Sequence, residues 1–485
     1  MRLMANPSGA GAIAQPDAWG EAGAVACGDL VRIEIGVRGG RIDRAGFRAR
    51  GCGATMAAAA AACARLEGAT MDDALRVSAR MLDRDLGGLG PQRLHGAEIA
   101  ADAASQALER WFTGRLGECG IPLQRDRVAV AMSGGVDSAV SAMLLADSGL
   151  DVVGVTMRLW HDPGAARAER SCCAPETVRL ARETCSALGI PHLVIDAAER
   201  FRREVVEDFV AGYRDGLTPN PCITCNGEVR FRILAEAAAL LGARLLATGH
   251  YARVAAGPGG APVVARAADG TKDQSYMLAR LTGPVLARLM LPLGDLQKDE
   301  VRARAAGRAL PAADAVESQD VCFVGVGGYV GFLERHGGLA SSPGEIVDLD
   351  GHVVGSHDGH WHFTVGQRRG IGVAGLEPLF VVSTDASTNR VVVGPRAALG
   401  SRYIRIEDAL IHGTPTGTLD VRIRHHGQSI RGRIRMTGAH SGEVVLEGTA
   451  EAVAPGQTAA LYDEGRIVAA GTIVRALARD EITEE

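Results

Sequence analysis

The chain has 485 residues, which is enough for three or more domains at roughly 150 residues each. Its 47% hydrophobic and 22% charged residues are ordinary for a globular protein, and they exclude a disordered or collagen-like chain. The net charge of −5 gives no overall attraction to a polyanion, so DNA coating is excluded and any nucleic-acid contact must come from local basic patches. The N-terminal residues carry no signal sequence and no apolar stretch reaches membrane-spanning length, so we expect a cytoplasmic protein without a membrane span.

Residues 20–115 are expected to form an α+β domain. The sequence VRIEIGVRGGRI alternates apolar and polar side chains on both sides of Gly39-Gly40, which predicts a β-hairpin. An Ala-rich stretch at residues 54–66 and two later segments have helical periodicity. Strands followed by helices are typical of an α+β unit.

Residues 125–290 alternate apolar strands, such as VAVAM and HLVID, with amphipathic helices. This alternation predicts an α/β domain with a doubly wound parallel sheet. Residues 291–342 are expected to form a helical connector. Short strands with frequent Gly then predict two small β domains, residues 343–398 and residues 399–478, the second of them a β-barrel.

The six residues Ser133–Ser138, SGGVDS, lie between a predicted strand and a predicted helix. Backbone N–H groups and the helix dipole favour an anion at such a turn, although a short Gly motif alone can be a plain turn. The lysine of a Walker motif is missing, which argues against γ-phosphoryl transfer. The motif resembles the pyrophosphate loop of ATP-pyrophosphatases, which cleave ATP between the α and β phosphates. That resemblance implies ATP with Mg²⁺.

The cysteines form a second pattern. Cys222 and Cys225 make a CxxC in NPCITCN, just before a predicted helix, and Cys322 lies far along the chain in SQDVCFVG. Two or three thiolates near a nucleotide site indicate sulfur chemistry, whereas a single cysteine is usually a small buried hydrophobe. We interpret the remaining cysteines of residues 60–190 as structural, namely Cys63, Cys119, Cys172, Cys173 and Cys185.

Residues 127–478 resemble the tRNA-specific 2-thiouridylases. The matching stretches occur in order: SGGVDS, MRLW, NPC-x-x-CNGEVRF, ATGHYAR, KDQSYML, ESQDVCFVG, HFTVGQRRG and APGQ. The resemblance implies ATP-dependent conversion of the wobble uridine of tRNA to 2-thiouridine, in which the uracil C2 oxygen is adenylated before sulfur replaces it. It also implies release of AMP and pyrophosphate, and a sulfur donor such as a cysteine desulfurase or a sulfur relay protein.

The same resemblance assigns site residues. Cys225 matches the nucleophile and Cys322 the cysteine that carries a persulfide. The implied nucleotide contacts are Ala131, Met132, Ser133, Gly134, Gly135, Val136, Asp137, Ser138, Met157 and Gly249. The implied tRNA contacts are Asn220, Pro221, Cys222, His250, Lys272, Asp273, Gln274, Arg424, His425 and Gln457.

One departure from the family pattern leaves two mechanisms open. Cys222 stands where some relatives carry Asp, so Cys222, Cys225 and Cys322 together match the three-thiolate ligand set of a substrate-binding 4Fe-4S cluster. In the alternative, a persulfide on Cys322 is resolved by Cys225 and Cys222 is incidental.

Arginines alternate in the β-rich end, at residues 422 and 424 and again at residues 431, 433 and 435, and no acid interrupts residues 421–435. Alternation places each set on one strand face, which suits phosphate contacts but also suits a plain solvated face.

Residues 20–112 resemble the NifU-like (IscU-type) iron–sulfur scaffolds, through ACGD, RGCGA and LHGAE. The resemblance implies Cys27, Asp29, Cys52 and His95 as ligands, with Gly96 in place of the third cysteine. Weak, transferable metal or cluster binding is therefore expected. A tethered domain can deliver sulfur or a cluster, and the alternative is a purely structural domain.

Two other functions compete with thiolation. One is another ATP-dependent ligase or amidating enzyme with the same loop, which needs no paired cysteines. The other is a non-catalytic iron–sulfur carrier that binds tRNA.

Overall fold

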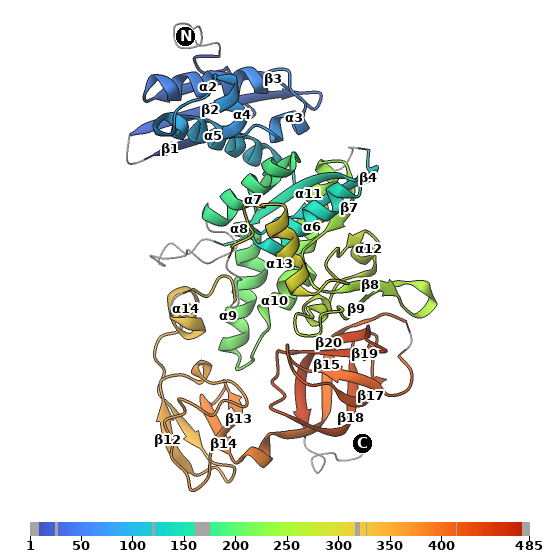
Figure 1. The fold of residues 1–485 in the computed structure, drawn as a ribbon. Coiled ribbons are helices and arrows are strands. Elements are labelled where there is room, and N and C mark those ends of the chain that lie inside the picture. The colour runs from blue at the N-terminus through green and yellow to red at the C-terminus, as the bar shows by residue number, and fades with distance from the viewer. Residues whose placement is uncertain are drawn as a thin grey trace.

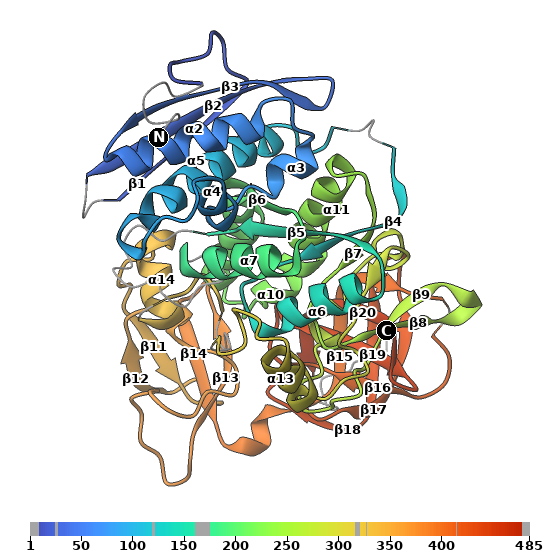
Figure 2. The same ribbon diagram turned by 45° about the horizontal axis from the view of Figure 1, so that its top comes forward.

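The computed structural model describes residues 9–24, 28–118, 122–160, 175–315, 321–325, 327–413 and 415–477. An N-terminal unit lies at one end of the molecule, an α/β unit in the middle, and two β-rich units at the other end (Figures 1 and 2). The multidomain fold expected from the sequence is confirmed. Among the described residues, no helix combines the length and apolar character needed to cross a membrane.

The N-terminal unit is a three-stranded antiparallel sheet covered by helices. Strands β2 and β3 form the predicted hairpin, in which Arg38 pairs with Arg41 around Gly39-Gly40. The Ala side chains of α2 and α5 are almost all buried, which lets the two helices pack closely on the sheet. The elements are β1 (Ala18–Ala24), β2 (Asp29–Arg38), β3 (Arg41–Arg50), α2 (Gly53–Leu66), α3 (Met71–Leu75), α4 (Ala79–Asp85), η1 (Pro91–Arg93) and α5 (Leu94–Thr113).

The α/β unit contains the predicted parallel sheet, in the strand order β10-β7-β4-β5-β6. The strands that follow β4 in the sequence, β5 and β6, lie on one side of it, and the later strands β7 and β10 lie on the other. The strand order therefore reverses between β4 and β7. Ligands of such sheets bind at the carboxyl ends of the strands at this reversal. The strands are β4 (Gln124–Ala131), β5 (Asp151–Arg158), β6 (His192–Asp196), β7 (Ala243–Ala247) and β10 (Leu289–Met290).

Helices connect and cover these strands. Two of them, η2 and η3, are π-helical turns, which are rare and frequent at functional sites. The connecting elements are α6 (Val136–Asp147), α7 (Pro175–Leu188), α8 (Ala198–Phe201), η2 (Arg202–Val206), α9 (Glu207–Arg214), α10 (Pro221–Thr224), η3 (Cys225–Arg230), α11 (Phe231–Leu240), η4 (Pro258–Gly260), η5 (Ser275–Leu278), α12 (Gly283–Leu286), α13 (Lys298–Gly307) and α14 (Gly328–Gly337).

The first β-rich unit is a four-stranded sheet in the order β12-β11-β14-β13. The second is a closed barrel of six strands in the order β15-β18-β17-β16-β19-β20. The barrel closes because the last strand, β20, also pairs with the first, β15. Strands β8 and β9, which come from the α/β region of the sequence, extend the barrel sheet beyond β20. The elements are β8 (Arg253–Ala256), β9 (Pro262–Ala265), β11 (Gly344–Val347), β12 (Val353–His357), η6 (His360–His362), β13 (Phe380–Asp385), β14 (Arg390–Gly394), η7 (Arg396–Leu399), β15 (Gly400–Ile411), β16 (Leu419–Arg422), β17 (Ile430–Met436), β18 (Gly442–Glu451), β19 (Thr458–Asp463) and β20 (Arg466–Leu477).

Helix α5 fastens the N-terminal unit to the α/β unit by lying against β6, an edge strand of the sheet. Buried apolar residues of the two units form one contiguous cluster. The two units are therefore packed together. Polar contacts also cross the junction: Arg158 pairs with Glu109, Arg182 with Asp102, and the Asp196 N–H donates to Thr113 Oγ1 at 3.1 Å.

Candidate functional site

The phosphate loop connects the end of β4 to the start of α6. Ser138 Oγ donates to the Gly135 carbonyl at 2.9 Å and accepts from the Ser133 N–H at 3.2 Å, which closes the loop on itself. Gly134 has a φ of +77°, and a Cβ there would lie 2.3 Å from the Thr177 carbonyl oxygen. Only glycine fits that position. The glycine allows this turn, which leads directly into the N-terminus of α6, where an anion is favoured.

Asp137, in the first turn of α6, is held by two groups that the sequence analysis did not assign. Lys298 Nζ lies 2.7 and 2.9 Å from the two carboxylate oxygens, and the Tyr251 hydroxyl donates at 2.8 Å. Lys298 is 7% exposed, and its N–H donates to Asp269 Oδ2 at 3.1 Å. A compositional signal was available, because Lys298 is one of only two lysines among 52 basic residues.

The loop after β7 meets the phosphate loop. A Cβ at Gly249 would lie 2.8 Å from the Asp137 carbonyl carbon and from Ser138 N, so the two loops are in direct contact. Met157 is buried at the end of β5, next to β4 in the sheet. The expected nucleotide contacts, Ala131–Ser138, Met157 and Gly249, thus lie at the carboxyl ends of β4, β5 and β7.

The CxxC lies on a short helix, α10, that continues into the π-helical turn η3. Asn220 caps this helix by accepting the Ile223 N–H at 3.4 Å, and Pro221 occupies the first helical position, where its missing N–H costs nothing. The spacing of three residues places Cys222 and Cys225 on one face of the helix. Cys225 is buried and Cys222 is half-buried.

The cysteine helix lies near the loop after β7, and the charge of Arg230 acts on a group in each, Cys222 and His250. Burial raises the pKa of the Cys222 thiol, the Arg230 guanidinium opposes this, and Cys225 raises the pKa further. Burial lowers the pKa of His250 to about 3, with Arg230 acting in the same direction, so this imidazole is neutral. The His250 and Phe231 rings are 6.1 Å apart. The cysteine pair and the phosphate loop therefore share one edge of the sheet.

Cys322 lies on the separate segment 321–325. Its neighbour Phe323 is buried among the rings of Phe201, Phe209 and Phe332, at 5.0 to 5.5 Å between centroids. Among the described residues, the groups of metal-binding side chains whose ligand atoms lie within 4.8 Å of one another do not include the three cysteines 222, 225 and 322. Cys322 is partly buried and packs against the same apolar core that contains Cys225.

The expected tRNA contacts at residues 272–274 bond within the protein. Asp273 is buried and accepts from Arg422 of the barrel at 2.9 Å. Gln274 accepts the Tyr251 N–H at 2.9 Å. Lys272 is half-buried beside them.

The barrel carries the other expected tRNA contacts. Arg424 is exposed, and His425 stacks on Tyr276 of η5 with ring centroids 6.2 Å apart. Gln457 Nε2 donates to the Thr218 carbonyl at 2.7 Å. Thr218 lies two residues before Asn220, which caps the cysteine helix.

The arginine pattern of the barrel holds for one strand and not for the other. On β17, Arg431, Arg433 and Arg435 alternate with less exposed residues and share one exposed face, as predicted. Strand β16 ends at Arg422, which points to Asp273, so Arg422 and Arg424 do not share a strand face. A turn lies between β16 and β17 and ends the alternation.

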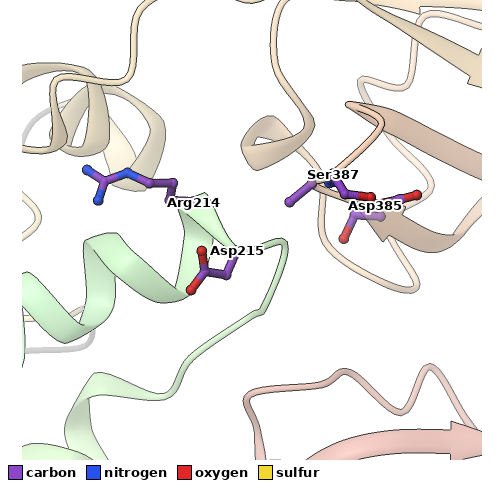
Figure 3. Close-up of a pocket in the computed structure, with 6 residues that line it drawn as sticks. Arg214, Asp215, Asp385 and Ser387 are labelled. Atoms are coloured by element: carbon purple, nitrogen blue, oxygen red, sulfur yellow. Dashed lines mark hydrogen bonds between the residues drawn. The ribbon is translucent and has the colours of Figure 1, made fainter.

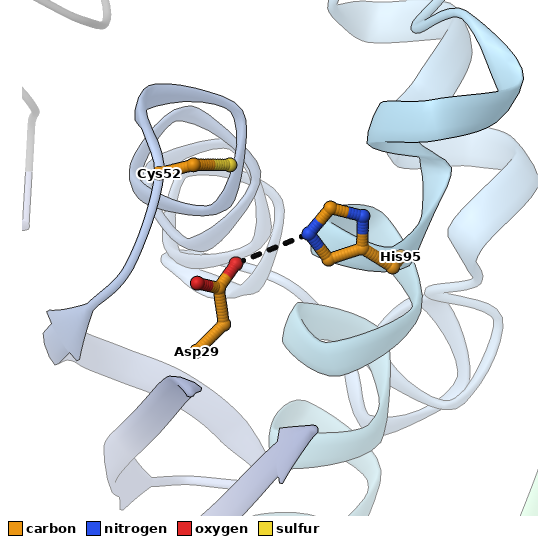
Figure 4. A group of neighbouring side chains, drawn as sticks. All are labelled: Asp29, Cys52 and His95. Atoms are coloured by element: carbon orange, nitrogen blue, oxygen red, sulfur yellow. Dashed lines mark hydrogen bonds and ion pairs between the residues drawn. The ribbon is translucent and has the colours of Figure 1, made fainter. Parts of the chain in front are cut away.

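The N-terminal unit gathers Asp29, Cys52 and His95, whose ligand atoms all lie within 4.8 Å of one another (Figure 4). His95 Nε2 is 3.1 Å from Asp29 Oδ2. A hydrogen bond with the Thr55 hydroxyl, and bonds from backbone N–H groups, lower the pKa of the exposed Cys52 thiol. The expected fourth ligand, Cys27, is outside the described residues.

Gly96, which replaces the third scaffold cysteine, has a packing role. A Cβ there would lie 3.0 Å from three atoms of Thr55, so the glycine lets α5 approach α2.

A surface pocket lies where the end of α9 meets the β13–β14 turn (Figure 3). None of the expected site residues lines it. Its lining residues are Arg214, Asp215, Thr384, Asp385, Ala386 and Ser387.

Four known families match the chain in order. They are the NifU-like N terminal domain at residues 1–116, the tRNA methyl transferase HUP domain at residues 126–326, the tRNA methyl transferase PRC-barrel domain at residues 331–395 and the Aminomethyltransferase beta-barrel domain at residues 402–473.

The bifunctional protein NifU/MnmA of Rubrobacter xylanophilus is 42% identical to this chain over 485 residues, which cover 97% of each chain. The chain belongs to the NifU/MnmA family. Both resemblances inferred from the sequence, to a 2-thiouridylase and to a NifU-like scaffold, are therefore confirmed. The tRNA-specific 2-thiouridylase MnmA of Xanthobacter autotrophicus is 44% identical over 362 residues, which cover 72% of this chain and 93% of that protein.

Among solved structures, the U34-tRNA thiolase NcsA of Methanococcus maripaludis with its 4Fe-4S cluster is 19% identical to the chain. The match covers 48% of this chain and 70% of the thiolase, with a TM-score of 0.28.

Proposed function

We propose that the chain is an ATP-dependent tRNA 2-thiouridylase that converts a wobble uridine to 2-thiouridine. The observation that carries this proposal is the match along 97% of a NifU/MnmA protein. The structure adds support, because the phosphate loop and the CxxC helix lie at the same edge of the sheet, joined by the loop that holds Gly249 and His250.

In the activation step, the loop at residues 133–135 and the N-terminus of α6 bind the ATP phosphates. The uracil C2 oxygen attacks the α-phosphorus and pyrophosphate leaves. Both carboxylate oxygens of Asp137 accept from Lys298, so the loop's own carboxylate is already paired. A Mg²⁺ ion entering with ATP would therefore be held chiefly by the phosphates.

For the sulfur step we propose a thiol route, because Cys225 matches the nucleophile and Cys322 the persulfide-bearing cysteine of the family. A 4Fe-4S cluster held by Cys222, Cys225 and Cys322 is the alternative. The outer sulfur of a Cys322 persulfide attacks C2 of the adenylated uridine, and AMP leaves. The Cys225 thiolate then attacks the Cys322 sulfur. A Cys225–Cys322 disulfide forms, the electron pair stays on the sulfur of 2-thiouridine, and a thiol reductant restores the enzyme.

The N-terminal unit is proposed to supply sulfur or a cluster to this site, from the group at Asp29, Cys52 and His95. A low thiol pKa and exposure are what a sulfur-accepting cysteine requires, and Cys52 has both. The sulfur itself would come from a cysteine desulfurase or a relay protein.

The test is an anaerobic assay of the full chain with unmodified tRNA, ATP, dithiothreitol, and a cysteine desulfurase with free cysteine as the persulfide donor. We expect 2-thiouridine by nucleoside mass spectrometry, with AMP and pyrophosphate in equal amounts, and iron is quantified on the same sample. Cys225→Ala should release pyrophosphate but form no 2-thiouridine. Cys185→Ala is the matched control, because Cys185 is fully buried and away from the cysteine helix.

Binding of iron and tRNA without any pyrophosphate release would contradict the proposal and favour a non-catalytic carrier. Four irons per chain, lost together with activity in Cys222→Ala, would instead establish the cluster mechanism.

A further inference from the structure

The barrel holds the segment that leads into the cysteine helix. The Thr218 N–H donates to the Pro455 carbonyl at 2.8 Å, and Gln457 Nε2 donates to the Thr218 carbonyl at 2.7 Å. Thr218 is thus bonded on both of its backbone groups by one turn of the barrel, two residues before Asn220 caps the helix.

Gly456 shapes that turn. Its φ is +90°, and a Cβ at this position would lie 3.0 Å from the backbone nitrogen and carbonyl carbon of Thr218. The turn therefore lies flat against Thr218, and any side chain at residue 456 would push the two segments apart.

The next barrel residue holds the other end of the cysteine helix. The Thr458 carbonyl accepts from the buried Tyr276 hydroxyl at 2.8 Å. Met277, the residue after Tyr276, accepts from Asn226 Nδ2 at 3.0 Å through its carbonyl. Asn226 directly follows Cys225. Two adjacent barrel residues, Gln457 and Thr458, thus hold the chain on both sides of the CxxC.

We propose that Gln457 is a positioning residue, which through Thr218 fixes the start of the helix that carries Cys222 and Cys225. Docking of the barrel then determines where the two thiols lie. This role belongs to the proposed thiolation site. Only the rate measurement below depends on the proposed function. It differs from the direct tRNA contact that the sequence implies for Gln457, because the side-chain amide already bonds within the protein.

The test compares Gln457→Met, which keeps the length of the side chain without its donor, with Gly456→Ala, which leaves Gln457 intact and crowds Thr218. Gly465→Ala is the matched control. Gly465 has a similar φ of +81° in the same barrel, but a Cβ there meets only the Arg266 side chain, at 4.0 Å.

Two measurements decide the outcome. The first is the rate at which iodoacetamide labels Cys222 and Cys225 without tRNA or ATP, read by peptide mass spectrometry. The second is kcat and KM for tRNA. We expect both test variants to be labelled several-fold faster, because the helix start is loosened, and kcat to fall about tenfold or more with KM within about twofold.

Unchanged labelling in both test variants overturns the inference, and so does an unchanged kcat. Weaker tRNA binding by Gln457→Met with unchanged labelling identifies Gln457 as a tRNA contact instead. If the unaltered protein forms no 2-thiouridine, the proposed function fails, and the labelling rates alone then decide whether Gln457 positions the helix.

Discussion

Asp137 places a carboxylate in the first turn of the helix that is proposed to receive phosphate, where an uncompensated negative charge would repel it. Lys298 supplies the compensation from a buried position. A compact ammonium on a flexible stem suits this buried position better than the broad, planar guanidinium of arginine, the basic residue used almost everywhere else in the chain.

We expect Lys298→Met to weaken ATP binding and to destabilise the protein by about 2 kcal/mol. A fully buried pair that loses one partner costs ~3–5 kcal/mol, and here the cost is lower because 30% of the Asp137 side chain is exposed. Calorimetric titration with ATP and thermal melting measure the two effects. Adding Asp137→Asn should restore most of the stability. Unchanged ATP affinity in Lys298→Met would show that the Lys298–Asp137 pair does not contribute to phosphate binding.

Cys52 gives a pH-dependent prediction at the same scale. Hydrogen bonds, first of all with Thr55, hold its pKa below the ordinary range, so more thiolate is present near neutral pH. We expect Thr55→Val to move the midpoint of Cys52 alkylation upward and to slow labelling at pH 7.5. The two proteins should react alike well above the ordinary thiol pKa, where both are ionised. Cys63, whose pKa burial raises to about 12, is the unreactive internal control. Identical midpoints would exclude a role for Thr55.

At the scale of single elements, the sequence predicted helices and strands better than their local irregularities. The residues after the CxxC have helical periodicity, yet Cys225–Arg230 form a π-helical turn. Such a turn depends on how the helix packs, here with Asn226 bonded to Met277 and Gly227 close to Arg280, and these partners are more than 50 residues away. Periodicity within a segment does not contain that information.

Helix α5 and strand β5 give a prediction about stability. Glu109 is nearly buried, which raises its pKa, while Arg158 opposes the shift. We expect Arg158→Met to lower the melting temperature at pH 7.5 and to have less effect at pH 5. Without the guanidinium the Glu109 pKa rises further, and an acid with a raised pKa in the folded state loses stability as pH increases toward that value.

The matched control for that prediction is Arg179→Met on α7. Arg179 pairs with Glu176 and Glu183, all three of them exposed, and surface pairs contribute about 0–1 kcal/mol. Equal losses in the two variants at both pH values would show that the Glu109 pair is no more important than a surface pair.

At the scale of the whole molecule, the order of the units followed from local patterns, because period-2 strands, βαβ alternation and the Gly-rich hairpin are each encoded within 10 to 30 residues. The arrangement of the site did not. Gln457 and Thr218 are 239 residues apart in the sequence, and Lys298 and Asp137 are 161 apart. Such pairs leave no local signature. The resemblance to a family assigned residues to a site, and the structure shows how these residues bond within the protein.

The position of α5 against β6 has a consequence for solubility. An uncovered edge strand offers unpaired backbone groups to other chains and is a common start of aggregation. We expect a fragment of residues 122–485 to self-associate, as measured by light scattering, whereas the full chain carrying Cys52→Ala remains monodisperse. A fragment that stayed monodisperse would show that β6 needs no cover. Because α5 packs against this edge strand, deleting the N-terminal unit would remove that contact together with any sulfur donor. Only the point substitution separates the two effects.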